Sequence, residues 1–285
     1  MLYEIGSSWS AAKQKRISLI GMSGVGKTFI ATQLRNSQNW FHYSVDYRIG
    51  TKYLGEEILD YFKKEAMRNA TLKKHLMDDS IYISSNISFS NLSPLSSYLG
   101  KPGNTNLGGI PFTEYLKRQK NHFKAEIEAS KDTSIFSQKA AEMYGYNHFI
   151  SDTSGSLCEV VEPENPDDPV LKSLSKSTLI VWIKGSPDQT EELYKRFVKA
   201  PKPMYYKESF LRRKWTEFCD IHNITEDSVD PDTFMSFGFK ALIQHRIPIY
   251  ERIARNWGVT IDAETLSKMK CEEDFIEIIK SAIGN

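Results

Sequence analysis

Residues 17–34 read ISLIGMSGVGKTFIATQL, in which an apolar stretch leads into a glycine-rich turn and then into a helical pattern. The turn from Gly21 to Thr28 fits GxxxxGK followed by Ser or Thr at every fixed position. Glycines allow the backbone to curl with its N–H groups pointing inward around phosphate oxygens, and a helix start adds partial positive charge there. A turn that only joined a strand to a helix would not need Lys27 and Thr28 at these places. The stretch therefore predicts a phosphate-binding loop.

Each residue type in this loop has a role toward a nucleotide. Lys27 is placed to reach the β- and γ-phosphates as a point charge, and the Thr28 hydroxyl is placed to ligate Mg²⁺. The motif thus predicts ATP and Mg²⁺ as cofactors, with Lys27 in a catalytic role. The residues expected to bind the nucleotide here are Gly21, Met22, Ser23, Gly24, Val25, Gly26, Lys27, Thr28 and Phe29.

Short apolar segments alternate with helical patterns along the chain. Strands separated by helices need crossover connections, so the pattern predicts an α/β fold with a parallel sheet covered on both faces. The predicted strands are 16–21, 40–45, 147–152, 178–185 and 258–263. The predicted helices are 27–36, 53–69, 113–130, 187–198, 207–220, 234–256 and 272–283.

Residues 79–110 are crowded with Ser, Asn, Gly and Pro and depart from this alternation. Long loops beside active sites often act as lids, whereas others are surface excursions, and both interpretations stay open. We expect an ordered insertion with a few short strands or turns, within a single domain that spans residues 1–285.

The composition limits the possible partners. The 37 basic and 36 acidic side chains nearly cancel, so no overall field attracts nucleic acid or an anionic membrane. Three widely separated cysteines suit a reducing compartment. The longest apolar run, 179–183, is too short to span a bilayer. We therefore expect a soluble, cytoplasmic monomer or homodimer with no nucleic-acid or membrane partner.

Several segments, taken in order, make the chain resemble the shikimate kinase family, small-molecule kinases with a nucleoside-monophosphate-kinase-like P-loop fold. The resemblance covers residues 15–77 and 112–283 in fragments. It implies a three-layer fold with a five-stranded parallel sheet in the order 2-3-1-4-5, and a helical lid region at 199–236. The segments that carry it are LIGMSGVGKT (19–28), FHYSVDYRIG (41–50), ISDTSGSLCEVV (150–161), IVWIKGSPDQTEELYKRFVKAPKPMYY (180–206) and ALIQHRIPIYERIARNWGVTIDA (241–263).

The resemblance assigns roles to residues at two strand ends. Asp46 matches the second of two acids that meet the metal and the substrate hydroxyl, and Ser44 stands in place of the first. Gly155 is what remains of three consecutive glycines that pass close to the substrate, and Asp152 comes just before it. Gly155 is therefore expected to contact the acceptor.

Basic residues late in the chain match the family's nucleotide and acceptor contacts. Arg196 matches an arginine at the base of the lid, on the nucleotide side. Lys202 stands where an arginine normally contacts the substrate, and Arg246 matches the arginine that grips the substrate carboxylate. Arg118 is the nearest candidate for a further substrate-side arginine.

The two acids allow structural interpretations beside the functional ones. Asp46 follows the second predicted strand at the edge where α/β sheets bind ligands, and would orient the acceptor hydroxyl; otherwise it caps a helix or lies in a solvated loop. Asp152 ends an apolar run, and would be catalytic by holding the Mg²⁺ water shell together with Thr28; otherwise it bonds its own backbone in a turn.

The basic residues are equally open to two interpretations. The guanidinium of Arg246, two residues before Pro248, suits bidentate binding of a carboxylate or a surface ion pair. Arg196, Lys199, Lys202 and Lys207 form a basic stretch that either closes over ATP phosphates or is one solvated helix face.

Two functions of different classes follow. The first is a phosphotransferase that moves the γ-phosphate of ATP to a hydroxyl of a small, anionic metabolite. The second is an ATP-binding protein or ATPase that has lost shikimate-type acceptor chemistry, because the changes at Ser44, Lys202 and the lost glycines all affect the acceptor side. A kinase acting on nucleotides or nucleic-acid ends is disfavoured by the near-neutral charge.

Overall fold

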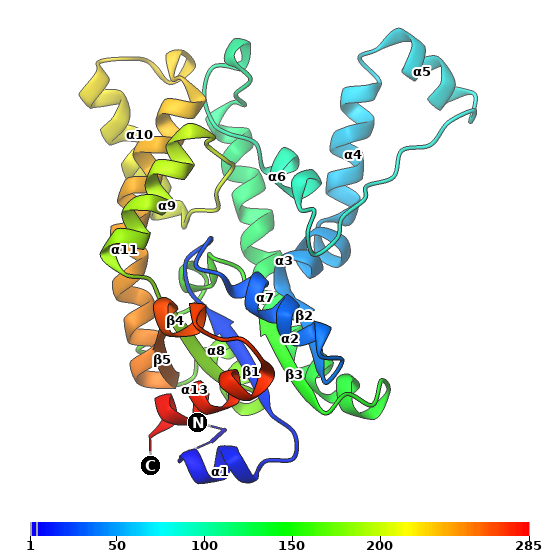
Figure 1. The fold of residues 1–285 in the computed structure, drawn as a ribbon. Helices are drawn as coiled ribbons and strands as arrows, with labels where there is room; N and C mark the ends of the chain where they lie inside the picture. Colours follow the sequence, from blue (N-terminus) through cyan, green and yellow to red (C-terminus); the bar gives the residue numbers. More distant parts are fainter. Residues whose placement is uncertain (1, 4, 285) are drawn as a thin grey trace. The chain divides into compact units, whose positions relative to one another are not determined.

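The computed structural model describes residues 2–3 and 5–284. It contains a five-stranded, all-parallel sheet in the order β2-β3-β1-β4-β5 (Figure 1). Both the α/β class and the predicted strand order are confirmed, and each strand ends within one residue of its predicted bounds. The strands are β1 (Arg16–Ile20), β2 (Trp40–Ser44), β3 (His148–Asp152), β4 (Leu179–Lys184) and β5 (Gly258–Asp262).

Helices of very different lengths connect and cover these strands. Two of them, α2 and α13, have the predicted bounds. The helices up to the long central one are α1 (Gly6–Ala11), α2 (Lys27–Asn36), α3 (Val45–Arg48), η1 (Ile49–Tyr53), α4 (Gly55–Ala66), α5 (Ala70–Met77), α6 (Ser93–Leu99), η2 (Thr105–Leu107) and α7 (Phe112–Glu142). Those that follow it are η3 (Leu157–Glu159), α8 (Pro169–Ser177), α9 (Pro187–Lys199), α10 (Glu208–His222), η4 (Glu226–Ser228), α11 (Pro231–Trp257), α12 (Ala263–Ser267) and α13 (Glu272–Ile283).

The chain forms two compact units, and two of the four boundaries between them fall inside α7 and α11. The sheet unit comprises Met1–Val45, Glu126–Pro201 and Ser236–Asn285. The second unit comprises Asp46–Ala125 and Lys202–Met235, and it holds the 79–110 insertion and most of the 199–236 lid region. The expectation of a single kinase-like domain stays a prediction.

Apolar side chains on one face of the sheet pack against α1, α2 and α13. Alternate residues of β1, Ile17 and Leu19, are fully buried there with Ile30 and Leu34 of α2. Trp40 of β2 lies edge-on to Phe275 of α13, with ring centroids 5.7 Å apart. This packing fixes the start of α2, and with it the loop that precedes α2, at the carboxyl end of β1.

The opposite face of the sheet is covered by the second half of α7 and by α8. Tyr43 of β2 stacks on Phe136 of α7 at 4.9 Å and donates a hydrogen bond to the Ala129 carbonyl. Ala129, Thr133 and Ala140 of α7 are buried. The sheet therefore lies between two helical layers, as the resemblance implied.

The predicted helix 113–130 is too short. Residues 130–137 are rich in Ser and Thr, which weakly disfavour a helix. Burial against the sheet overrides this preference, so α7 continues for 31 residues. The predicted helix 53–69 is also wrong at both ends, because η1 precedes α4 and Asn69 caps a separate helix, α5.

The 79–110 segment was expected to hold a few short strands or turns, and it has turns and isolated bridges, but also helices that were not expected. It contains a seven-residue helix, α6, with Pro94 in its first turn, and two isolated bridges, Ser88 with Asn91 and Pro102 with Ile110.

The second unit also has an aromatic centre, in which Trp215 of α10 stacks on Phe112 at 4.4 Å. No helix among residues 2–3 and 5–284 combines the length and apolarity needed to cross a bilayer.

Candidate functional site

The loop between β1 and α2 has the backbone conformation that its glycines predict. Gly21, Gly24 and Gly26 have φ angles of 141°, 88° and 101°, which side chains with a Cβ rarely adopt. Gly26 is the N-cap of α2, so the loop ends at the positive end of the helix dipole. The loop therefore has the shape of an anion cradle.

Lys27 is folded back onto this loop. Its Nζ donates hydrogen bonds to the Gly21 carbonyl at 2.8 Å and to the Met22 carbonyl at 3.0 Å. The side chain is only 6% exposed. The ammonium is thus held at the loop by two of its backbone carbonyls.

The two residues predicted to hold Mg²⁺ lie in direct contact. Thr28 Oγ1 donates a 2.5 Å hydrogen bond to Asp152 Oδ2. Asp152 ends β3, which pairs with β1, and this pairing brings the acid to the loop. Ser44 lies on the neighbouring strand β2, where it is buried and paired in register with Asp152 of β3.

A buried histidine lies behind Asp152. His42 Nε2 is 3.9 Å from Asp152 Oδ2, and the histidine side chain is fully buried. Burial, together with the positive charge of Arg35, lowers the pKa of His42 to about 4. At neutral pH the imidazole is therefore uncharged, and it does not neutralise the carboxylate.

Gly155 lies directly against the phosphate loop. A Cβ at this position would come within 2.7 Å of the Ser23 nitrogen and 3.0 Å of its Cα. Two donors from α11 meet at the Gly155 carbonyl: Arg246 Nη1 at 2.8 Å and the Tyr250 hydroxyl at 3.0 Å. The turn after β3 is therefore clamped between α11 and the loop.

Arg246 is buried in an ion pair. It is 1% exposed, and its Nε donates to Glu159 Oε1 at 2.9 Å. Burial alone would raise the pKa of Glu159, but the nearby His245, whose Nε2 lies 3.5 Å away, and the charge of Arg246 hold it below its usual value. Contact of Arg246 with an acceptor carboxylate, and of Gly155 with the acceptor, stay predictions.

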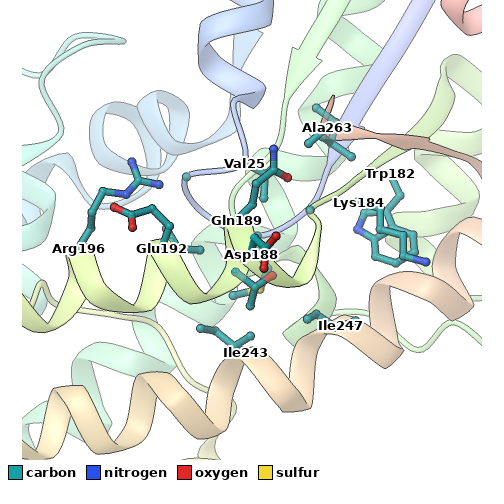
Figure 2. Close-up of a pocket in the computed structure, with 16 residues that line it drawn as sticks. Val25, Trp182, Lys184, Asp188, Gln189, Glu192, Arg196, Ile243, Ile247 and Ala263 are labelled. Carbon is teal, nitrogen blue, oxygen red and sulfur yellow. The ribbon is translucent and has the colours of Figure 1, made fainter. Parts of the chain in front are cut away.

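An apolar pocket of about 410 Å³ opens beside the loop. Figure 2 shows its walls, with Val25 from the loop, Trp182 from β4, and Ile243 and Ile247 from α11. Arg196 lies on the exposed side of α9, at one end of the pocket, and Glu192 lies one turn before it. The pocket has the size and the apolar walls to accept a nucleobase.

The residues predicted on the acceptor side, other than Arg246 and Gly155, belong to the second unit. Asp46 is half-buried in the first turn of α3. Lys202 is exposed and lines a polar cavity of about 700 Å³. Other residues that line this cavity are Ser90, Ser93, Ser96, Ser97 and Lys101.

Arg118 has a structural environment in the second unit. Its guanidinium lies over the rings of Tyr61 and Tyr98, at 5.0 and 5.3 Å from their centroids. Its Nε donates to Glu114 at 2.9 Å, and its Nη1 donates to the Tyr98 carbonyl. These contacts hold Arg118 within the packing of α4, α6 and α7.

Sequence reasoning missed Glu159, Tyr250 and His42. A single acid inside the apolar run LCEVV is a signal of a buried, paired carboxylate. The spacing of Arg246 and Tyr250 by four residues places both on one helix face. His42 alternates with apolar neighbours in β2 and carries no comparable signal. Among the residues that the structure describes, no three His, Cys, Asp or Glu gather into a metal site.

No protein-family model matches this chain, and no curated protein matches it. A solved structure of a shikimate kinase from Bacteroides thetaiotaomicron is similar to it, with 14% sequence identity and a TM-score of 0.34, over 94% of this chain and 95% of that chain. That protein belongs to the family that the sequence resembles, but the likeness is too low to carry an argument. The assignment of a P-loop kinase-like fold therefore depends on this chain's own sheet order and phosphate loop.

Proposed function

We propose that this protein is a P-loop kinase that binds ATP with Mg²⁺ and transfers the γ-phosphate to a hydroxyl of a small, anionic metabolite. The observation that carries the proposal is the convergence of Lys27, Thr28 and Asp152 at a loop with three glycines of positive φ. Loop amides and an ammonium suit the phosphates, while a hydroxyl and a carboxylate suit Mg²⁺ and its water shell.

The proposed contacts to the nucleotide begin at the phosphate loop and extend to the apolar pocket. The amides of residues 21–29 would hold the β-phosphate, and Lys27 would turn from the loop carbonyls to the β- and γ-phosphates. Thr28 and Asp152 would hold Mg²⁺, which neutralises charge on the phosphates when bound. The apolar pocket lined by Val25, Trp182 and Ile247 would take the base, with Arg196 near its rim.

The acceptor contacts are the part that depends on the resemblance. Asp46 would orient the attacking hydroxyl, because transfer to an alcohol needs an acid that accepts its proton. Lys202 would meet the acceptor's negative charge, since it is exposed and lines the polar cavity of the second unit. A cytoplasmic location would supply both ATP and a metabolite, and remains part of this proposal.

A second candidate is an ATPase or ATP-binding protein without acceptor chemistry. It is favoured by Ser44 at the place of the first acid, and by the burial of Arg246 against Glu159. Both features remove groups from the acceptor side and leave the phosphate loop intact.

The test has two stages. Calorimetry with ATP or ADP and Mg²⁺ should give a dissociation constant in the micromolar range, and no association at millimolar nucleotide would refute both candidates. ADP release is then measured over a panel of sugar acids, hydroxy acids and sugar phosphates. Release well above the rate without acceptor supports the kinase, whereas nucleotide binding with no response to any acceptor supports the ATPase.

A further inference from the structure

We propose that Arg246, Tyr250 and Glu159 form a positioning device that holds the phosphate loop in its binding shape through the backbone of Gly155. This inference rests on the proposed nucleotide site and gives Arg246 a role different from binding the acceptor. It is carried by a continuous series of contacts from α11 to the loop, all within the sheet unit.

The first contact in the series is made at the Gly155 carbonyl, which accepts hydrogen bonds from two side chains. Arg246 and Tyr250 are one helical turn apart on α11, and both donate to the oxygen of Gly155, at 2.8 and 3.0 Å. A carbonyl that accepts from a guanidinium and a phenol is held in position and direction, because each donor has its own preferred geometry. Gly155 is thus fixed by α11 and not only by its own turn.

The second contact explains why a charged pair is buried here. Arg246 and Glu159 are 1% exposed or less, and their side chains meet at 2.9 Å. Taking two charges out of water is costly, so such a pair contributes little to stability on balance and is better explained by what it positions. Glu159 orients the guanidinium so that Nη1 points at Gly155.

The third contact transmits this position to the loop. The Gly155 backbone is so close to Ser23 that a Cβ at residue 155 would lie 2.7 Å from the Ser23 nitrogen. Ser23 belongs to the loop whose amides are expected to face phosphate. A displacement of Gly155 therefore displaces a phosphate-binding amide.

The turn is held from α7 as well. Ser156 Oγ donates to Glu126 Oε2 at 2.7 Å, and Ser154 and Ser156 share a hydrogen bond of 2.8 Å. The turn after β3 is therefore held by side chains of both α7 and α11. The phosphate loop packs against this turn at Gly155.

The test compares Tyr250→Phe with Tyr43→Phe. Each change removes one hydroxyl that donates to a backbone carbonyl of the sheet unit, Gly155 or Ala129, so the two variants lose the same kind of hydrogen bond. Calorimetry with Mg²⁺ measures the affinities for ADP and for adenosine, which lacks phosphate. For Tyr250→Phe we expect ADP to bind about three- to tenfold more weakly, with adenosine affinity changed less than about twofold, as for the loss of one hydrogen bond acting on the phosphates.

Two further variants keep the test decisive. The pair Glu159→Gln with Arg246→Met removes both charges together, so that no unpaired charge is left buried, and it should lower ADP affinity by more than Tyr250→Phe does. Gly155→Ala should act directly at Ser23, while Gly55→Ala, whose Cβ has no neighbour closer than 3.7 Å, is its control.

Each outcome decides the inference. A loss of ADP affinity in Tyr250→Phe and Gly155→Ala, with Tyr43→Phe and Gly55→Ala like the wild type, supports it. Equal effects of Tyr250→Phe and Tyr43→Phe, or equal losses for ADP and adenosine, overturn it while leaving the nucleotide site in place. A wild-type protein that binds no ADP overturns both the inference and the proposed function.

Discussion

Thr28 and Asp152, 124 residues apart in the chain, meet through a 2.5 Å hydrogen bond between a hydroxyl and a carboxylate. The contact joins the first turn of α2 to the end of β3, and it exists because β3 and β1 are neighbours in the sheet. Because the Thr28 hydroxyl donates its proton to the carboxylate, the lone pairs of the hydroxyl oxygen point away from Asp152. Under the proposed function, this hydroxyl and this carboxylate would supply oxygen ligands to Mg²⁺ and its water shell.

Asp152→Asn should abolish the dependence of nucleotide affinity on Mg²⁺. The amide cannot replace a carboxylate in the metal's water shell, so we expect MgADP to bind about tenfold or more weakly, while ADP with EDTA binds as to the wild type. Calorimetry under both conditions measures this. Asp167→Asn, on an exposed loop, is the control. Mg²⁺-dependent binding that survives Asp152→Asn would assign the metal to other groups.

Lys27→Met should remove most of the phosphate affinity and leave the fold intact. Methionine keeps the apolar stem of the nearly buried lysine but donates nothing to phosphate. We expect ADP to bind at least about tenfold more weakly, as for a lost charge-assisted hydrogen bond, with little change in the thermal midpoint. Lys176→Met, at an exposed position of α8, should bind ADP as the wild type does. Equal affinities in the two variants would remove Lys27 from the site.

Much of the fold could be predicted because its signals are local. The phosphate loop and the five apolar strands are each specified by residues adjacent in sequence, and the sheet order follows the family that the motifs resemble. The length of α7 was not predictable in this way. Its second half is stabilised by burial of Ala129, Thr133 and Ala140 under the sheet, which no local propensity reports.

The site shows the same division between local and long-range signals. Lys27 and Thr28 are specified by their motif, and Asp152 by its place at a strand end. The partner of Arg246 could not be predicted from a motif or a strand end, because Glu159 lies 87 residues away and only the packed fold brings the two together. A guanidinium that looks suited to a substrate carboxylate is, in the structure, paired with a carboxylate of the chain itself.

His42 should make the stability of the sheet unit depend on pH. Its pKa is about 4 in the folded protein, because of burial and Arg35, and about 6.5 in the unfolded chain. Between these values the unfolded chain binds more protons, so stability is full above about pH 6.5 and falls as the pH drops toward 4. We expect a loss of about 2 kcal/mol between pH 7 and pH 5 from this group.

Urea unfolding of the wild type and of His42→Gln at both pH values isolates this contribution. The glutamine variant does not titrate, so the difference in free energy of unfolding between the two proteins should shrink, or change sign, at the lower pH. A difference that is the same at pH 7 and pH 5 would mean that His42 keeps an ordinary pKa when folded.

Asp46→Asn separates the kinase from the ATPase. If Asp46 accepts the proton of the attacking hydroxyl, the variant should release ADP about a hundredfold more slowly with the best acceptor of the panel, the usual magnitude for a general base. Its MgADP affinity should stay within about twofold of the wild type, because the phosphates are held by the loop and not by this acid. Asp60→Asn, on the exposed face of α4, makes the same change in net charge and should alter neither the rate of ADP release nor the MgADP affinity. Acceptor-dependent ADP release at the wild-type rate in Asp46→Asn would exclude this acid as the base, and a wild type without any acceptor response would leave hydrolysis as the reaction that the phosphate loop serves.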